Sequence, residues 1–368
     1  MKRFENILVV LDRKTDSGAL IERAVTLGQR NQARLTVVVV AEELPQDLPT
    51  QVAAQPTGIE APGIDIIEEL PPDIFAPAKP VPAYIQEPTS DTLEALLPEG
   101  TKPVPSKSPL VIQEQIAEDD SHYLDQVTAS IQQAGVQVNT KVLHGTPFLT
   151  IIQEVLRNDH DMVMIAAEGR RVFKEMFYGR TSMHLMRKCP CPVWVMNPDQ
   201  PKHYSHILAA VDPTPSSEER DTLNIKIMDL ATSLAHREHC ELLVIHTWTF
   251  SLESHMRSGR VNVPLSKVDE WERALRDKHR RSLGDLLQPY DLTNLEHQVY
   301  MLRGEAGRLI PALAAAKEVE LIVMGTVSRT GVTGFLIGNT AEKVLRQVDC
   351  SVLVVKPDKF VTPVKLDE

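Results

Sequence analysis

The stretch NILVVLD, from Asn6 to Asp12, returns as HILAAVD from His206 to Asp212, 200 residues later. Two further stretches return 159 residues later: DMVMIAAEG from Asp161 as ELIVMGTVS from Glu320, and GRTSMHLMRKCPCPVWVMNPD from Gly179 as GNTAEKVLRQVDCSVLVVKPD from Gly338. The two offsets, 200 and 159 residues, differ by 41, so the first copy contains a net insertion of that size. A repeat this long indicates two duplicated domains and not a solenoid array.

Each copy alternates apolar strands with amphipathic helices. In the second copy we predict strands at 206–212, 241–247, 295–302, 320–325 and 351–355, and helices at 216–237, 266–288, 305–317 and 340–347. The strands are nearly continuous apolar runs, which is typical of a sheet covered on both faces. Strand–helix alternation of this kind predicts an α/β fold, with a doubly wound, Rossmann-like parallel sheet in each of two tandem domains.

An acidic, proline-rich segment interrupts the first copy. Residues 45–109 hold 14 of the 26 prolines, and residues 42–118 hold 14 acidic and 3 basic side chains. That segment therefore carries −11, which equals the net charge of the whole chain. We expect a flexible, partly extended insertion at about 44–109. A tether or binding arm and a passive loop both remain open as its role.

The domain limits follow from this pattern. We predict a first domain at 1–199 that includes the insertion, a second domain at 204–358 and a C-terminal tail at 359–368. The turn-rich stretch NPDQP, residues 197–201, is the expected hinge between the domains.

Composition excludes several classes of protein. The 368 residues are 42% hydrophobic and 24% charged, which is typical of a soluble globular chain. No apolar run approaches the length of a membrane span, and the amino terminus is expected to be a first strand and not a signal peptide. Four cysteines without a framework spacing favour a reducing cytoplasm. We expect no direct nucleic-acid binding, because the charge excess is acidic.

The loop after the fourth strand of the second copy is the candidate ligand site. It reads GTVSRTGVTGFLIGNT, from Gly325 to Thr340. Gly325 allows close approach of the backbone, and Gly338 opens a helix whose free N–H groups favour a phosphate. Asp212, which follows the first strand, has an acceptor for a ribose hydroxyl or an adenine edge. The alternative is that the glycines only form a tight turn and that Asp212 only caps a helix.

The spacing Gly–x2–Gly–x9–Gly–Ser/Thr after a fourth strand resembles the nucleotide loop of the universal stress protein family. Segments at both ends of the copies carry the same resemblance, including HLMRKCPCPVWVM and GNTAEKVL. The resemblance implies a tandem member that binds a small ligand, with the nucleotide ATP as a candidate cofactor. Its site residues map to Asp212, Gly325, Ser328, Gly338, Asn339 and Thr340. Two positions depart from the family pattern: Ser328 replaces the second glycine, and Asn339 stands where Ser or Thr is usual.

The first copy departs further from the family loop. Its equivalent positions are Ala166, Gly169, Gly179 and Arg180, so a methyl group and a bulky side chain stand where a phosphate would approach. We therefore expect ATP only in the second domain. The resemblance also implies an intramolecular pseudo-dimer in which the last strands of the copies, 192–196 and 351–355, form the contact. Further homo-oligomerisation is left open.

Other motifs are interpreted as structural. Cys189-Pro-Cys191 has no second cysteine pair nearby to complete a zinc site, and Cys350 occupies the place equivalent to Cys191. The basic stretch from Arg273 to Arg281 is interspersed with acidic residues, which favours a solvated helix face. Residues 255–263, between the second strand and its helix, are expected to be a loop that could cover the strand ends as a lid.

No Walker A loop, nucleophile elbow or paired catalytic carboxylates occur, so neither a catalytic nor a metal site is predicted. Our first hypothesis is a cytoplasmic, non-enzymatic ligand-binding protein. The resemblance implies a role in resisting starvation or DNA damage. A second hypothesis is a slow ATPase or self-phosphorylating enzyme that uses the hydroxyls of Ser328 and Thr340. A third is an interaction module that binds no ligand or a ligand other than ATP.

Overall fold

The computed structural model describes residues 4–13, 15–41, 109–168, 177–201, 203–213, 218–251, 253–258, 263–326 and 338–366. The chain divides into two compact units, residues 1–43 with 116–368 and residues 44–115. The predicted insertion lies outside the described residues up to residue 108, as does Ser328 of the candidate loop.

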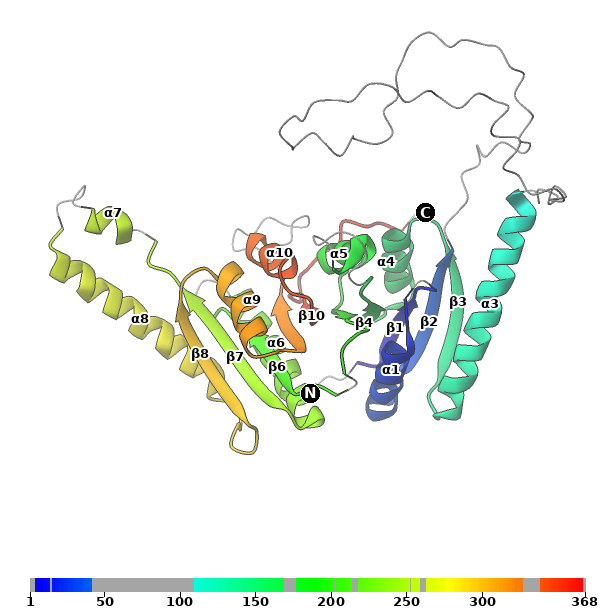
Figure 1. The fold of residues 1–368 in the computed structure, drawn as a ribbon, viewed down its shortest axis with the longest axis horizontal. Coiled ribbons are helices and arrows are strands. Elements are labelled where there is room, and N and C mark those ends of the chain that lie inside the picture. The colour runs from blue at the N-terminus through cyan, green and yellow to red at the C-terminus, as the bar shows by residue number, and fades with distance from the viewer. Residues whose placement is uncertain are drawn as a thin grey trace, which may run out of the picture. The chain divides into compact units, whose positions relative to one another are not determined.

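Within the described residues, ten strands form one sheet in the order β3-β2-β1-β4-β5-β10-β9-β6-β7-β8 (Figure 1). Each half follows the same order, and all neighbours within a half are parallel. The predicted doubly wound α/β architecture is thereby confirmed. The strands are β1 (Asn6–Leu11), β2 (Arg34–Ala41), β3 (Val138–His144), β4 (Met162–Ala166), β5 (Val193–Met196), β6 (His206–Ala210), β7 (Glu241–Trp248), β8 (His297–Arg303), β9 (Leu321–Gly325) and β10 (Ser351–Val355).

The two halves meet where β5 pairs with β10, which we call the seam. This pair is antiparallel, with Trp194 opposite Leu353 and Val195 opposite Val352. Both strands are fully buried. The predicted contact between the last strands of the two copies, and with it the pseudo-dimer, is confirmed.

Helices cover both faces of the sheet because side chains alternate along each strand. Ile7, Val9 and Leu11 belong to a core with α1, α3, α6 and α8, whereas Leu8 and Val10 belong to a core with α4, α5, α9 and α10. The helices are α1 (Gly18–Asn31), α3 (Pro109–Gln133), α4 (Pro147–Asn158), α5 (Gly179–Lys188), α6 (Glu218–Glu238), α7 (Glu253–Arg257), α8 (Leu265–Leu287), α9 (Ala306–Ala316) and α10 (Asn339–Leu345). In the described part of the chain, none of them is both long and apolar enough to cross a membrane.

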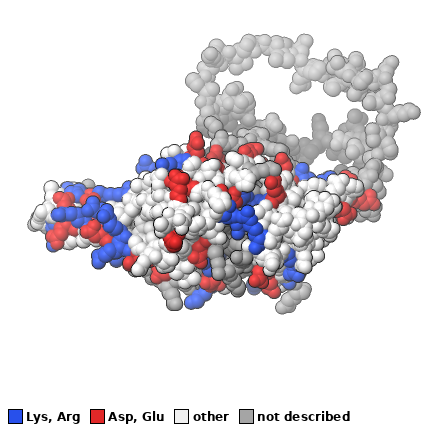
Figure 2. All heavy atoms as spheres, turned by 90° about the horizontal axis from the view of Figure 1, so that it is seen from below, with Lys and Arg blue, Asp and Glu red and all other residues white. Residues whose placement is uncertain are grey.

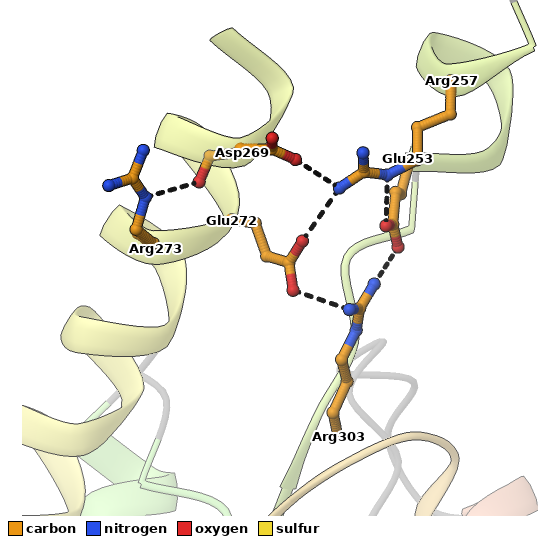
Figure 3. A network of polar contacts seen from close by, with 6 residues as sticks. All are labelled: Glu253, Arg257, Asp269, Glu272, Arg273 and Arg303. Atoms are coloured by element: carbon orange, nitrogen blue, oxygen red, sulfur yellow. Dashed lines mark hydrogen bonds and ion pairs between the residues drawn. The ribbon is translucent and has the colours of Figure 1, made fainter. Parts of the chain in front are cut away.

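The segment between β7 and α8 was expected to be a loop that could act as a lid. Its described part instead forms the short helix α7, which ion pairs hold against α8 and β8 (Figure 3). Arg257 binds Asp269 and Glu272 of α8 at 2.7 and 3.1 Å, and Glu253 pairs with Arg303 at the end of β8. Figure 1 draws α7 far from α10, the helix that follows the candidate loop.

The basic stretch of α8 lies in the same region. Arg273, Arg276, Arg280 and Arg281 are exposed, and Arg273 and Arg281 donate to the backbone carbonyls of Asp269 and Asp277. Figure 2 shows acidic and basic side chains interleaved at the end of the molecule where α7 and α8 lie. This agrees with the interpretation as a solvated helix face.

Candidate functional site

Asp212 and the end of β9 lie at the same edge of the sheet. β6 and β9 are parallel neighbours, with Ala210 beside Met324, so the residues that follow them emerge together. The backbone of Asp212 is fixed by Asn224 of α6: its N–H donates to Asn224 Oδ1 at 2.9 Å, and its carbonyl accepts from Asn224 Nδ2 at 2.9 Å. Asn224 is 4% exposed, which makes this contact a buried support of the Asp212 turn.

The candidate loop is closed at its base by one backbone hydrogen bond. The Gly338 N–H donates to the Thr326 carbonyl at 2.7 Å. We call Thr326 and Gly338 the loop neck; the residues between them, 327–337, lie outside the described part. Asn339 and Thr340 follow the neck as the first two residues of α10, and both are exposed. The structure therefore brings Asp212, Gly325 and Gly338 to one edge of the second half.

Gly325 also has a packing reason to be glycine. A Cβ atom built on Gly325 would lie 2.7 Å from Cδ2 of Leu223 on α6, well inside van der Waals contact. Packing against Leu223 is thus a reason for glycine at this position that differs from both the close approach to a ligand and the tight turn considered from the sequence.

In the first half, the position equivalent to Gly338 is covered by a carboxyl group. Gly179 begins α5 with φ +75°, and a Cβ atom built on it would lie 1.9 Å from Cδ of Glu168. Ala166 is the last residue of β4 and is buried, Arg180 is exposed, and Gly169 lies outside the described residues. A carboxylate at the start of a helix occupies the kind of place that a phosphate oxygen would take. Sequence comparison did not single out Glu168, since its contact with Gly179 is tertiary.

Lys356 contacts the loop neck from the other side. It follows β10 and is 3% exposed. Its Nζ donates to the Thr326 hydroxyl at 2.5 Å and to the carbonyl of Met186 on α5 at 2.7 Å. Burial lowers the pKa of Lys356 to about 7. Sequence analysis missed this residue, although the repeat alignment places it opposite Asn197.

A cleft of about 90 Å³ lies elsewhere, between α1, the 196–204 connection and the end of α6. Arg23 and Glu238 form an ion pair there at 2.7 Å, with side chains 9% and 7% exposed. The Arg23 guanidinium lies over the ring of Tyr204, 4.2 Å from its centroid. None of the predicted site residues that the structure describes lines this cleft.

The cysteines pack in the core. Cys189 and Cys191 are buried with their Sγ atoms 3.5 Å apart, and Cys350 is buried in the same core cluster. Among the described residues, no group of three or more His, Cys, Asp or Glu side chains is arranged to hold a metal ion.

Comparisons with known proteins agree with this architecture. A model described as the Universal stress protein family matches residues 3–69, 83–197 and 203–356. The chain is 32% identical to Universal stress protein E of Escherichia coli (strain K12) over 238 residues, which cover 64% of this chain and 73% of that protein. It is 23% identical to Universal stress protein E of Photorhabdus laumondii over 99% of both chains.

The fold also matches a crystal structure of a functionally unknown protein from Pseudomonas aeruginosa PAO1. The TM-score is 0.62 at 21% sequence identity, over 96% of this chain and 93% of that one. Together with the repeated five-stranded halves and the antiparallel seam, the family match establishes the conclusion: the chain is a tandem member of the universal stress protein family.

Proposed function

We propose that this chain is a stress-response protein that binds a nucleotide in its second half, at Asp212 and the loop from Gly325 to Thr340. The observation that carries the proposal is the difference between the halves. Glu168 fills the space over Gly179 in the first half, whereas the repeat alignment places the uncharged Val327 opposite Glu168 in the second half. A phosphate-bearing ligand would meet a carboxylate in the first half and a glycine backbone in the second.

The roles of the residues follow from their chemistry. Asp212 would accept hydrogen bonds from a ribose hydroxyl or a base amine. The backbone N–H groups of Asn339 and Thr340 and the hydroxyl of Thr340 would donate to phosphate oxygens, with Ser328 as a further donor. The Gly338 N–H already donates to the Thr326 carbonyl, so Gly338 would serve by letting the ligand approach the backbone closely. ATP is the ligand that this donor and acceptor set fits, and we assign it to the second half alone.

We further propose that the protein acts in the cytoplasm as a ligand-dependent stress factor, in resistance to starvation or DNA damage, and not as an enzyme. What supports this is the name carried by the relatives and a candidate site made of donors and acceptors with no assigned base. Slow ATP hydrolysis, or phosphate transfer to Ser328 or Thr340, is the competing function. ATP turnover that disappears in Asp212→Ala would favour it.

Substitution of Asp212 by alanine tests the site. Loss of a charge-assisted hydrogen bond of about 1.5–3 kcal/mol should weaken ATP binding roughly 10- to 100-fold. Isothermal titration calorimetry with ATP and magnesium measures the change, and native mass spectrometry of the freshly purified protein weighs any ligand that is retained.

The matched control is Asp12→Ala, because Asp12 follows β1 as Asp212 follows β6. This variant should bind ATP as the unmodified protein does. Equal losses in both variants would contradict the assignment to the second half. An unmodified protein that binds no ATP would leave the interaction module as the better description.

A further inference from the structure

The amine of Lys356 joins the two halves of the molecule at the loop neck. Its Nζ donates to the carbonyls of Met186 and Arg187 in the last turn of α5, at 2.7 and 3.4 Å, and to the Thr326 hydroxyl at 2.5 Å. It also lies 4.7 Å from the centroid of the Phe360 ring. The three hydrogens of an ammonium group thus have acceptors from both halves.

This contact has no charged counterpart in the first half. The repeat alignment places Asn197 opposite Lys356. The Asn197 side chain also crosses the seam, where its amide donates to the Asp349 carbonyl at 2.8 Å. Both positions therefore bind the opposite half, but only Lys356 brings a titratable group, and only Lys356 reaches a loop neck.

Hydrogen bonds of Thr326 connect Lys356 to the base of the candidate loop. Thr326 is 1% exposed; its hydroxyl binds Lys356 and its carbonyl accepts from the Gly338 N–H. A continuous series of hydrogen bonds therefore runs from the end of α5, through Lys356 and Thr326, to the glycine that starts α10.

The charged neighbours of Lys356 are engaged with one another. Arg187 of α5 pairs with Glu342 of α10 at 2.8 Å, and Lys226 of α6 pairs with Asp358 of the tail. Within the described residues, the Lys356 amine contacts two backbone carbonyls, a hydroxyl and an aromatic ring, but no carboxylate. Burial is accordingly the main cause of its lowered pKa of about 7, and the neighbouring Cys189 acts in the opposite direction.

Both protonation states of Lys356 fit the same positions of the heavy atoms. An ammonium donates to all three partners. A neutral amine has two hydrogens and a lone pair, and the two α5 carbonyls can only accept. The Thr326 hydroxyl must then turn and donate to Nζ. Loss of the proton therefore reverses one hydrogen bond at the neck and removes a positive charge from it.

We propose that Lys356 is a proton-controlled link between the first half and the ligand loop of the second, and that the Thr326 hydroxyl changes direction with its charge. Only the predicted effect of Lys356 on ligand binding rests on the proposed function. The charged form favours an anionic ligand at the loop, so affinity for ATP should fall as the pH rises through neutrality.

The effect on folding has the opposite sign. The pKa of Lys356 is lower in the folded chain than in the unfolded chain. Between about pH 7 and the ordinary lysine value of about 10.4, the unfolded chain holds the proton and the folded chain does not. Its contribution therefore makes the protein more stable as the pH rises through this window, and is constant below it.

The titration of Lys356 can be observed directly. NMR of protein labelled with ¹³C at the lysine Cε positions should show one lysine with a midpoint near pH 7, and this signal should be absent in Lys356→Met. The Thr326 methyl and Gly338 amide signals should shift with the same midpoint. Asn197→Ala, which removes an uncharged contact across the same seam, should leave all three titrations in place. A Lys356 midpoint above about pH 9, or neck signals that do not follow it, would overturn the proposal.

A second measurement tests the consequence for the ligand. ATP affinity of the unmodified protein should fall about 5- to 10-fold between pH 6 and pH 8.5, a coupling of ordinary size. The terminal phosphate of ATP also titrates in this range, so both proteins should show the pH dependence that comes from the ligand. The part that comes from the Lys356 amine should be absent in Lys356→Met, which makes the comparison of the two proteins decisive. Identical pH profiles would refute the effect on the ligand. If ATP binds neither protein at any pH, the proposed function fails, and the NMR titration alone decides the link.

Discussion

Replacing Arg23 with methionine should lower the free energy of unfolding by about 3–5 kcal/mol, because it leaves the carboxylate of Glu238 buried without its partner. The two side chains are 9% and 7% exposed, and the other described partner of the Glu238 carboxylate is the His203 imidazole at 3.5 Å, whose side chain is 89% exposed. The pair joins α1 of the first half to α6 of the second, and its loss should weaken the packing between the halves. Urea unfolding followed by circular dichroism measures the change.

Two variants distinguish the buried charge from other causes. Arg23→Met combined with Glu238→Leu removes both charges and should recover most of the loss, since a buried pair replaced by apolar side chains is often neutral. Lys267→Met breaks a pair whose side chains are 46% and 61% exposed, and should change stability by less than about 1 kcal/mol. A double variant as unstable as Arg23→Met would argue against the explanation by charge.

Trp194→Ala should have an effect of similar size, a loss of about 3–5 kcal/mol, through the cavity that it leaves at the seam. Trp194 lies on β5 opposite Leu353 of β10 and is 1% exposed. The same unfolding experiment applies, with Trp271→Ala as the matched control, because Trp271 on α8 is 39% exposed. Comparable stabilities of the two variants would contradict a structural role for the seam.

The two large effects should not simply add. The Arg23 guanidinium lies 5.6 Å from the centroid of the Trp194 ring, so the side chains share one contact region. Variants at residues in contact are usually coupled. The loss in Arg23→Met combined with Trp194→Ala should therefore differ from the sum of the single losses.

The architecture was predictable because the sequence repeats it and because each strand is a long apolar run. The antiparallel contact between β5 and β10 was also predicted, through the family resemblance. The predicted strand at 206–212 ends two residues earlier, at Ala210. The reason is that the Asp212 backbone bonds to the Asn224 side chain and not to a neighbouring strand.

The candidate site was predictable only in part. The carboxyl ends of parallel strands share an edge, which is why Asp212, Gly325 and Gly338 could be grouped from the sequence. The contacts of Glu168 and Lys356 could not be foreseen, since they depend on how a side chain crosses between elements. For Lys356 one signal existed: a long cation stands where the first copy has Asn197.

The antiparallel seam also has a consequence during synthesis of the chain. Val195 pairs with Val352, which the ribosome adds 157 residues later. At about 5–20 residues per second, the first half is present for roughly 8–30 s before its partner strand exists. During this interval the outer edge of β5 has unpaired N–H and C=O groups, the kind of edge that recruits a strand from another molecule. The nascent first half therefore has a period of exposure to aggregation that ends only when the second half is complete.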